Sequence, residues 1–253
     1  MKNSFEYAAL APVVVLLLAG VLSVLVEAFA PRTYRRAAQL LLVSASLVLS
    51  FAYVLISATK VLPGGAELNG GQSHGLRQLV VNGAAAIDGP GLFIQGTLIL
   101  VALVSALLIA ERHVDPQGDA FAARSSTLPG SEDERQFTAQ GWSQTEVWPL
   151  FLFSVGGMVL FPVANDFLTM FVALEVFSLP LYLMAGLARR RRLLSQEAAL
   201  KYFVLGAFSS AFFLFGVALI YSATAALSFG AVSAALVSAA NNSLVLAGVG
   251  LIA

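Results

Sequence analysis

Six stretches of apolar residues, each close to the length of a membrane-spanning helix, constrain this chain more than any other feature. They cover residues 7–30, 37–58, 88–110, 147–163, 166–188 and 197–219. A helix rises about 1.5 Å per residue, so roughly 20 residues cross the ~30 Å hydrocarbon core of a bilayer. A seventh apolar run starts at Ser243, and the sequence ends within it at Ala253. The sequence predicts an all-α polytopic membrane protein with six complete transmembrane helices and the start of a seventh, truncated from a longer chain.

The composition excludes several other classes of protein. Charged residues make up 11% of the 253 residues, against about 25% in soluble domains, and the formal net charge is zero. This excludes an ordinary soluble domain, a disordered tail and a nucleic-acid-binding protein. The absence of cysteine excludes disulfides, iron–sulfur clusters and thiolate catalysis in this chain. With only His74 and His113 in addition, we expect no metal site.

Basic residues are unevenly distributed between the two sets of loops. Ten of the 14 Lys and Arg residues lie in the loops after the first, third and fifth spans. Lys2, Lys60 and Arg77 lie on the other side, and Lys201 is inside the sixth span. Because short cytoplasmic loops are enriched in Lys and Arg, this bias predicts that the N-terminus is outside the cell membrane. We expect the arginine run 189–192 to anchor the cytoplasmic side beside lipid phosphates.

Two long loops divide the predicted spans. The organisation is spans 1 and 2 (1–58), an external Gly-rich loop (59–87), span 3 (88–110), an acidic cytoplasmic loop (111–146) and the remaining spans (147–253). The acidic loop is the best candidate for a disordered segment or an insert specific to one lineage.

Three acids lie at the ends of predicted spans. Asp88 and Asp166 each begin a helix, where the positive end of the helix dipole favours an acid. Glu27 lies near the end of the first span, where the dipole disfavours it, so we expect a cationic partner among Arg32, Arg35 and Arg36. A role in transport is the alternative for all three acids, because ionisable residues within a membrane are costly and often functional.

Glu175 differs from these acids in its depth. It follows Asp166 by nine residues, which puts it roughly 13 Å along the helix and near the membrane midplane. No basic residue lies within one helical turn of it. A protonation site or charge partner is the favoured interpretation, and a neutral, hydrogen-bonded structural acid is the alternative.

Lys201, in the sixth span, has two interpretations. It can snorkel to the inner interface and pair with Glu197 at the favourable i, i+4 spacing. Alternatively, it can turn toward Glu175 across an axial offset of roughly 13 Å, which one or two waters would help to bridge. A buried Glu–Lys pair suits proton transfer, because a small change in water access or separation changes the proton occupancy of both groups.

Side chains along this route offer further polar groups. Pro180 interrupts the backbone hydrogen bonding of the helix beside Glu175. The hydroxyl groups that would hold water along the route are those of Ser178, Tyr182, Tyr202, Ser209 and Ser210.

Two segments resemble a known family. Residues 165–182 read NDFLTMFVALEVFSLPLY, and residues 197–221 read EAALKYFVLGAFSSAFFLFGVALIY. A mid-span Glu followed by Ser-Leu-Pro-Leu-Tyr, and then Glu-Ala-Ala-Leu-Lys-Tyr, resembles the antiporter-like membrane subunits of bacterial respiratory complex I, NADH:quinone oxidoreductase, particularly those of the subunit N type. The close resemblance covers about residues 147–221.

The resemblance carries expectations of its own. It implies that Glu175 and Lys201 belong to a polar axis that couples quinone reduction to proton translocation. It also implies that NADH, FMN, iron–sulfur clusters and quinone are handled by partner subunits, that M-type and K-type membrane subunits are neighbours, and that the protein lies in the bacterial inner membrane. The family has about fourteen helices, so this chain would hold the first part of the fold.

Other functions remain open at this stage. A subunit of a multisubunit cation/proton antiporter or of a membrane-bound hydrogenase would share the Glu and Lys pattern. A non-transporting scaffold would tolerate Gln at position 175.

Overall fold

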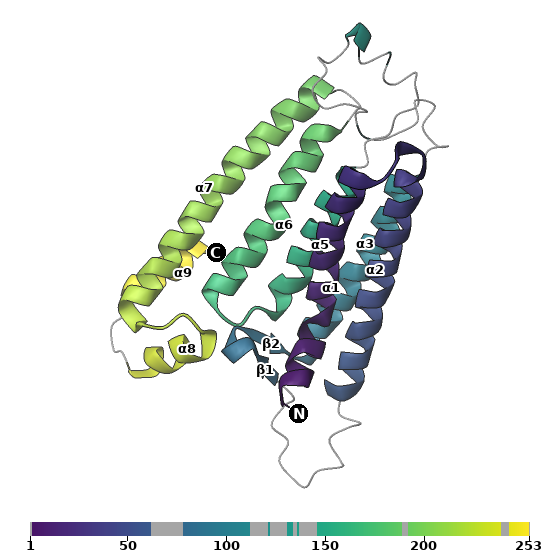
Figure 1. The fold of residues 1–253 in the computed structure, drawn as a ribbon. Helices are drawn as coiled ribbons and strands as arrows, with labels where there is room; N and C mark the ends of the chain where they lie inside the picture. The colour runs from purple at the N-terminus through teal and green to yellow at the C-terminus, as the bar shows by residue number, and fades with distance from the viewer. Residues whose placement is uncertain are drawn as a thin grey trace.

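The computed structural model describes residues 2–61, 78–111, 121, 131–133, 136, 146–188, 192–238 and 243–252. The helices are α1 (Lys2–Phe29), α2 (Arg32–Val61), α3 (Gly89–Ala110), α5 (Val147–Leu160), α6 (Phe167–Leu187), α7 (Arg192–Thr224), α8 (Phe229–Ser238) and α9 (Ser243–Ile252). Among these residues, α1, α2, α3 and α5 pack into a bundle, α6 packs on α5, α7 packs on α6, and the short helices α8 and α9 pack on α7 (Figure 1).

Five of the described helices are long and apolar enough to cross a membrane. These stretches are Ala9–Phe29, Arg32–Thr59, Gly89–Ala110, Phe167–Leu187 and Leu193–Thr224. The predicted fourth span is a shorter apolar unit, in which α5 continues through the 3-10 turn η3 (Phe161–Val163). The predicted sixth span is longer than expected, because α7 begins five residues before Glu197 and ends five residues after Leu219. The prediction of an all-α membrane fold is confirmed.

Two local features differ from the predicted loops. Within the range predicted as an external loop, α2 continues to Val61, and residues 78–87 form a hairpin of β1 (Gln78–Val80) and β2 (Ala85–Ile87). A 3-10 turn, η2 (Val81–Gly83), closes this hairpin with Asn82 and Gly83 at φ values of 52° and 91°, a region that Gly and Asn tolerate. The short helix α8, before the seventh apolar run, is also absent from the prediction. Most of the acidic loop 111–146 lies outside the described residues, but Phe121 forms a β-bridge with Ala188.

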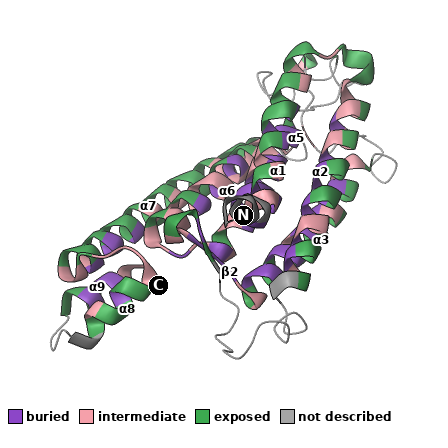
Figure 2. Cartoon of the chain, turned by 60° about the horizontal axis from the view of Figure 1, so that its bottom comes forward, coloured by how far each residue is buried: buried purple, intermediate pink, exposed green. Residues whose placement is uncertain are grey.

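The main core lies among α1, α2, α3 and α5. Leu16, Leu47, Ile99 and Leu152 are buried there, one from each helix. A second, smaller cluster of Ile220, Val232 and Val245 joins α7, α8 and α9. Figure 2 shows buried residues concentrated inside the helix array, while the outer faces of α2, α3 and α7 are exposed. These exposed faces are apolar, as expected for helices surrounded by lipid or by other helices.

Hydrogen bonds made by Asn165 connect the β-hairpin with the starts of two helices. The Asn165 side chain donates to the Gly83 carbonyl at 2.6 Å, and its backbone N–H donates to Ala84 O at 2.8 Å. Its carbonyl accepts from the N–H of Phe229 at 3.1 Å. The hairpin, the start of α6 and the start of α8 are therefore fixed relative to one another, and this fixes the position at which α6 enters the helix array.

The close approach of α5 and α6 depends on Gly157. A Cβ atom at this position would lie 2.5 Å from the backbone nitrogen of Phe177 and 2.9 Å from the carbonyl oxygen of Ala173. Because both neighbours are backbone atoms, they cannot move aside without shifting α6. Small residues at such positions allow helix backbones to pack closely in membranes.

Gly157→Ala is expected to separate α5 from α6 and to lower the free energy of unfolding by about 1–3 kcal/mol, the usual cost of overpacking. The measurement is the unfolding temperature of the purified protein. Gly250→Ala in α9 is the matched control, because a Cβ atom there meets nothing within 4 Å. Equal unfolding temperatures for the two variants would contradict this account of the α5–α6 contact.

Candidate functional site

Glu175 lies near the middle of α6, on the face that packs against α7. It is roughly 12 Å from the first residue of the helix and 18 Å from the last, at 1.5 Å per residue. Its carboxylate oxygen Oε1 accepts a hydrogen bond from the hydroxyl of Ser210 in α7, and both residues are half-buried. The mid-span acid therefore has a neutral hydroxyl as its partner.

Aromatic contacts flank this hydrogen bond on both sides. Phe171 stacks on Phe213, with ring centroids 5.9 Å apart and an interplanar angle of 25°. At the other side, the Tyr182 ring makes an edge contact with Tyr202, with centroids 4.4 Å apart. These contacts set the antiparallel register of α6 and α7, and this register places Ser210 opposite Glu175.

The Tyr182 side chain also fixes the separation of the two helices. It is buried, and its hydroxyl lies so close to α7 that a Cβ atom at Gly206 would be 1.8 Å from Tyr182 Oη. Of the other predicted hydroxyl groups on α6, Ser178 donates to the Leu174 carbonyl of its own helix rather than to Glu175. Pro180 lies within α6, one turn beyond Glu175, and cannot donate to the carbonyl of Val176.

Lys201 lies on the opposite face of α7 from Ser210. The two residues are nine positions apart, which is two and a half helical turns and an axial separation of roughly 13 Å. The Lys201 ammonium contacts Glu197 Oε1 at 2.5 Å, and both side chains are exposed, at 69% and 57%. Lys201 therefore pairs with Glu197 on its own helix and does not contact Glu175 directly. Tyr202 and Ser209 are exposed on the same helix.

Asp88 and Asp166 are N-caps, as their positions at the starts of helices predicted. Asp88 Oδ1 accepts from the backbone N–H of Gly91 at 2.8 Å in α3. Asp166 accepts from the N–H of Thr169 at 2.7 Å and from the Thr169 hydroxyl at 2.8 Å in α6. Each carboxylate satisfies backbone donors that a helix start would otherwise leave without a partner.

Glu27 has the cationic partner that its place near the end of α1 required. Arg35 Nη1 contacts Glu27 Oε1 at 2.9 Å, and Arg35 also donates to the Ala30 carbonyl, near the end of α1, at 2.9 and 3.2 Å. Gln39 Nε2 lies 3.3 Å from Glu27 Oε2 and 2.9 Å from Ser23 O. Ser23 and Gln39 are fully buried and complete a polar cluster between α1 and α2.

Sequence reasoning missed Ser23 and Gln39, although the chain carries a usable signal. Ser23 and Glu27 are four residues apart on one helix, and Arg35 and Gln39 are four residues apart on the next. Each pair therefore shares a helix face, and the short turn between α1 and α2 brings these faces together. The buried Gln95, whose amide donates to Val159 O at 2.8 Å, was also missed.

The described residues contain no group of three or more His, Asp or Glu side chains able to hold a metal ion. His74 and His113 lie outside the described residues.

Comparisons with known proteins bear on residues 164–253, which contain the Glu175 site. This segment matches the family model for NADH:quinone oxidoreductase/Mrp antiporter transmembrane proteins. Over this segment the chain matches the antiporter-like membrane subunit family. With its long apolar helices, it is a multi-pass membrane protein.

Relatives named as subunit N align with most of this chain. NADH-quinone oxidoreductase subunit N 3 of Streptomyces griseus is 49% identical over 237 residues, which cover 90% of this chain and 41% of the relative. Subunit N of Mycobacterium tuberculosis is 47% identical over 262 residues, covering 98% of this chain and 47% of the relative. The predicted resemblance to subunit N is confirmed, and the chain spans less than half the length of these relatives.

A solved structure of respiratory complex I from Thermus thermophilus with bound aureothin contains a chain with the same fold. The match has a TM-score of 0.64 and 26% identity, and it covers 95% of this chain and 42% of that chain. The antiporter-like fold is thus supported by structure as well as by sequence.

Asp166→Ala is expected to remove the α6 N-cap and to lower the free energy of unfolding by about 1 kcal/mol. Asp166→Asn retains an oxygen that accepts the Thr169 N–H, so it should retain the stability. Thermal unfolding is measured for both variants. An unfolding temperature of Asp166→Ala equal to that of Asp166→Asn would contradict the role of the Asp166 side chain as a stabilising cap.

Proposed function

We propose that this chain is part of a proton-translocating membrane subunit of NADH:quinone oxidoreductase, of the subunit N type, with Glu175 as its proton-binding residue. The observation that carries the proposal is a mid-membrane acid with a hydroxyl partner, in a chain whose relatives are subunits N of this enzyme. An ionisable residue at this depth is a functional candidate because a membrane interior disfavours charge.

The Ser210 hydroxyl suits a carboxyl group that changes its protonation state. A serine hydroxyl has one donor and two acceptor lone pairs. It donates to Glu175 when the carboxylate is ionised, and after a rotation it accepts from Glu175 when the carboxyl is protonated. The hydrogen bond between α6 and α7 is thus available in both states, so proton binding does not require the two helices to separate.

In this proposal, Lys201 is the second charged residue of the axis and acts at a distance. It is roughly 13 Å from the level of Glu175 along α7 and faces away from α6. Proton transfer between them therefore requires bridging water or a rotation of α7, and Tyr182, Tyr202 and Ser178 are the hydroxyl groups available along the route. Lys201 forms an ion pair with Glu197, and the strength of this pair depends on the charge of both groups. A change in the protonation of one group would therefore change the proton affinity of the other.

The wider assembly follows from the same proposal. Other complex I membrane subunits, particularly those of the M and K types, would be the neighbours, and NADH, FMN, iron–sulfur clusters and quinone would be bound by partner subunits. The protein would lie in the bacterial inner membrane with its N-terminus outside and the basic α1–α2 turn in the cytoplasm, as the distribution of Lys and Arg indicates.

A subunit of a multisubunit cation/proton antiporter is the alternative that one observation favours, because the matching family model describes Mrp antiporters as well. Such a protein would use the same acid but would exchange cations without NADH or quinone. A scaffold subunit would not need the Glu175 carboxyl group at all.

Glu175→Gln in the full-length protein within its native complex tests the proposal. Proton uptake and NADH-driven quinone reduction are recorded together in membrane vesicles. Both rates should fall at least about tenfold with assembly intact, since a positioned acid–base group commonly contributes 10²–10⁴-fold. Normal rates would support the scaffold, and cation-driven proton exchange without quinone reduction would support the antiporter.

Ser210→Ala and Ser209→Ala form a matched pair on α7. Ser210→Ala should reduce proton uptake about tenfold or more, because a hydrogen bond to a charged group contributes about 1.5–3 kcal/mol. Ser209 is exposed, so Ser209→Ala should have no effect. Equal effects of the two substitutions would contradict the role given to the Ser210 hydroxyl.

A further inference from the structure

The Tyr182 ring fills the α6–α7 interface on the Lys201 side of the Glu175–Ser210 hydrogen bond. Tyr182 follows Glu175 by seven residues, or two helical turns, so both side chains lie on the face of α6 that packs against α7. Gly206, which the Tyr182 hydroxyl approaches, precedes Ser210 by four residues and shares its face of α7. Lys201 lies five residues nearer the start of α7 than Gly206. The Tyr182 ring therefore lies between the level of Glu175 and the level of Lys201.

Aromatic side chains and helix backbone enclose this ring. Tyr182 is 8% exposed and makes edge contacts with Tyr202, at an interplanar angle of 87°, and with Phe203, whose ring centroid is 5.8 Å away. Its hydroxyl end lies against the α7 backbone, since a Cβ atom at Gly206 would overlap with Tyr182 Oη. A ring enclosed in this way blocks a file of water molecules along the interface between Glu175 and Lys201.

The hydroxyl group of Tyr182 favours a second position of the ring. Among the residues that the structure describes, it has no hydrogen-bond partner, although buried tyrosine hydroxyls usually have one. A rotated position in which the hydroxyl reaches water gains a hydrogen bond, and this gain offsets the ring contacts that are lost. The Phe171–Phe213 stack on the other side of Glu175 has no polar atom and gains no hydrogen bond by moving. The Tyr182 ring is therefore the more mobile of the two aromatic barriers.

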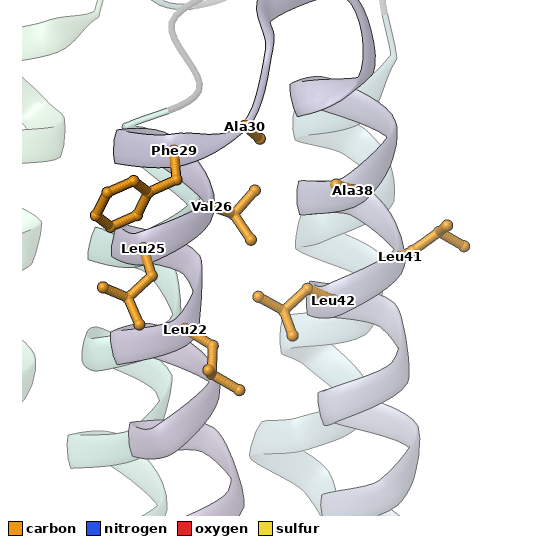
Figure 3. A pocket seen from close by; sticks show the side chains of 8 residues that line it. All are labelled: Leu22, Leu25, Val26, Phe29, Ala30, Ala38, Leu41 and Leu42. Carbon is orange, nitrogen blue, oxygen red and sulfur yellow. The ribbon is translucent and has the colours of Figure 1, made fainter.

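The apolar groove between α1 and α2 does not offer water a comparable route (Figure 3). Its lining residues are Leu, Val, Phe and Ala, so none of their side chains can hydrogen-bond to water. The α6–α7 interface, in contrast, contains the Glu175 carboxyl group and the Ser210 hydroxyl. Control of water access is therefore relevant at the α6–α7 interface.

We propose that Tyr182 is a gate between Glu175 and the Lys201 side of the membrane, and that Gly206 is the residue that allows its ring to close. This inference rests on the proposed function of Glu175 as the proton-binding residue. With the ring in place, water does not connect Glu175 with Lys201. When the ring turns out of the interface, water enters and a proton moves between the Glu175 carboxyl oxygen and that water. Tyr182 is thus a positioning residue that controls access to Glu175.

The test is the passive proton leak of the full-length protein in its native complex, measured in membrane vesicles with an imposed pH gradient and no NADH. A leak requires both aromatic barriers to open together, so loss of the Tyr182 ring leaves only the Phe171–Phe213 stack. Tyr182→Ala should raise the leak at least about tenfold, which corresponds to a barrier lowered by about 1.4 kcal/mol. Gly206→Ala should also raise it, because the added Cβ atom displaces the end of the ring without removing any group. Addition of Glu175→Gln should abolish the leak of either variant.

Two control variants are compared at equal amounts of assembled complex. Tyr182→Phe keeps the ring, and Phe208→Ala removes a ring that is 64% exposed on α7, so both should leak no more than the native complex. A native leak in both Tyr182→Ala and Gly206→Ala would overturn the gate, as would an equal leak in Tyr182→Ala and either control. A leak that persists after Glu175→Gln supports the gate but shows a route that bypasses Glu175, and it counts against the proposed function alone.

Discussion

The structure depends on the pairing of polar side chains that cannot be hydrated within a membrane. In hydrocarbon, an unsatisfied polar group costs several kcal/mol, so a partner inside the protein stabilises such a group strongly. Asp88 and Asp166 meet this requirement with backbone N–H groups, Glu27 with Arg35, and Gln39 with Ser23. These pairs fix the starts of α3 and α6 and hold α1 against α2.

Glu175 meets the same requirement in a different way. Glu27 has a cation within 3 Å, and Asp88 and Asp166 have backbone donors at helix starts, where the dipole also favours them. Glu175 has the hydroxyl of Ser210, near the centre of a span, with aromatic contacts on both sides. A hydroxyl tolerates both a charged and a neutral partner, whereas an arginine or a helix start favours the charged one. This difference is the physical basis for proposing Glu175, rather than the other acids, as the residue that exchanges protons.

Sequence patterns predicted best those features that depend on a single helix. The apolar length of each segment indicated the spans, and the places of Asp88 and Asp166 at helix starts indicated their caps. Patterns were less informative where two helices must be aligned. Which α7 residue lies opposite Glu175 depends on the register set by Phe171, Phe213 and the Tyr182–Gly206 contact, and these contacts are not visible in either helix alone. The direction of Lys201 follows from that register, because a residue nine positions from Ser210 lies half a turn around the helix.

The most direct measurement of the central claim is infrared difference spectroscopy of the full-length protein in its complex, with and without turnover. The account predicts a carbonyl-stretch band of a protonated carboxyl group that changes during turnover, disappears in Glu175→Gln and shifts in frequency in Ser210→Ala. A turnover-linked spectrum that is the same in the native protein and in Glu175→Gln would contradict the assignment of Glu175 as the proton-binding residue.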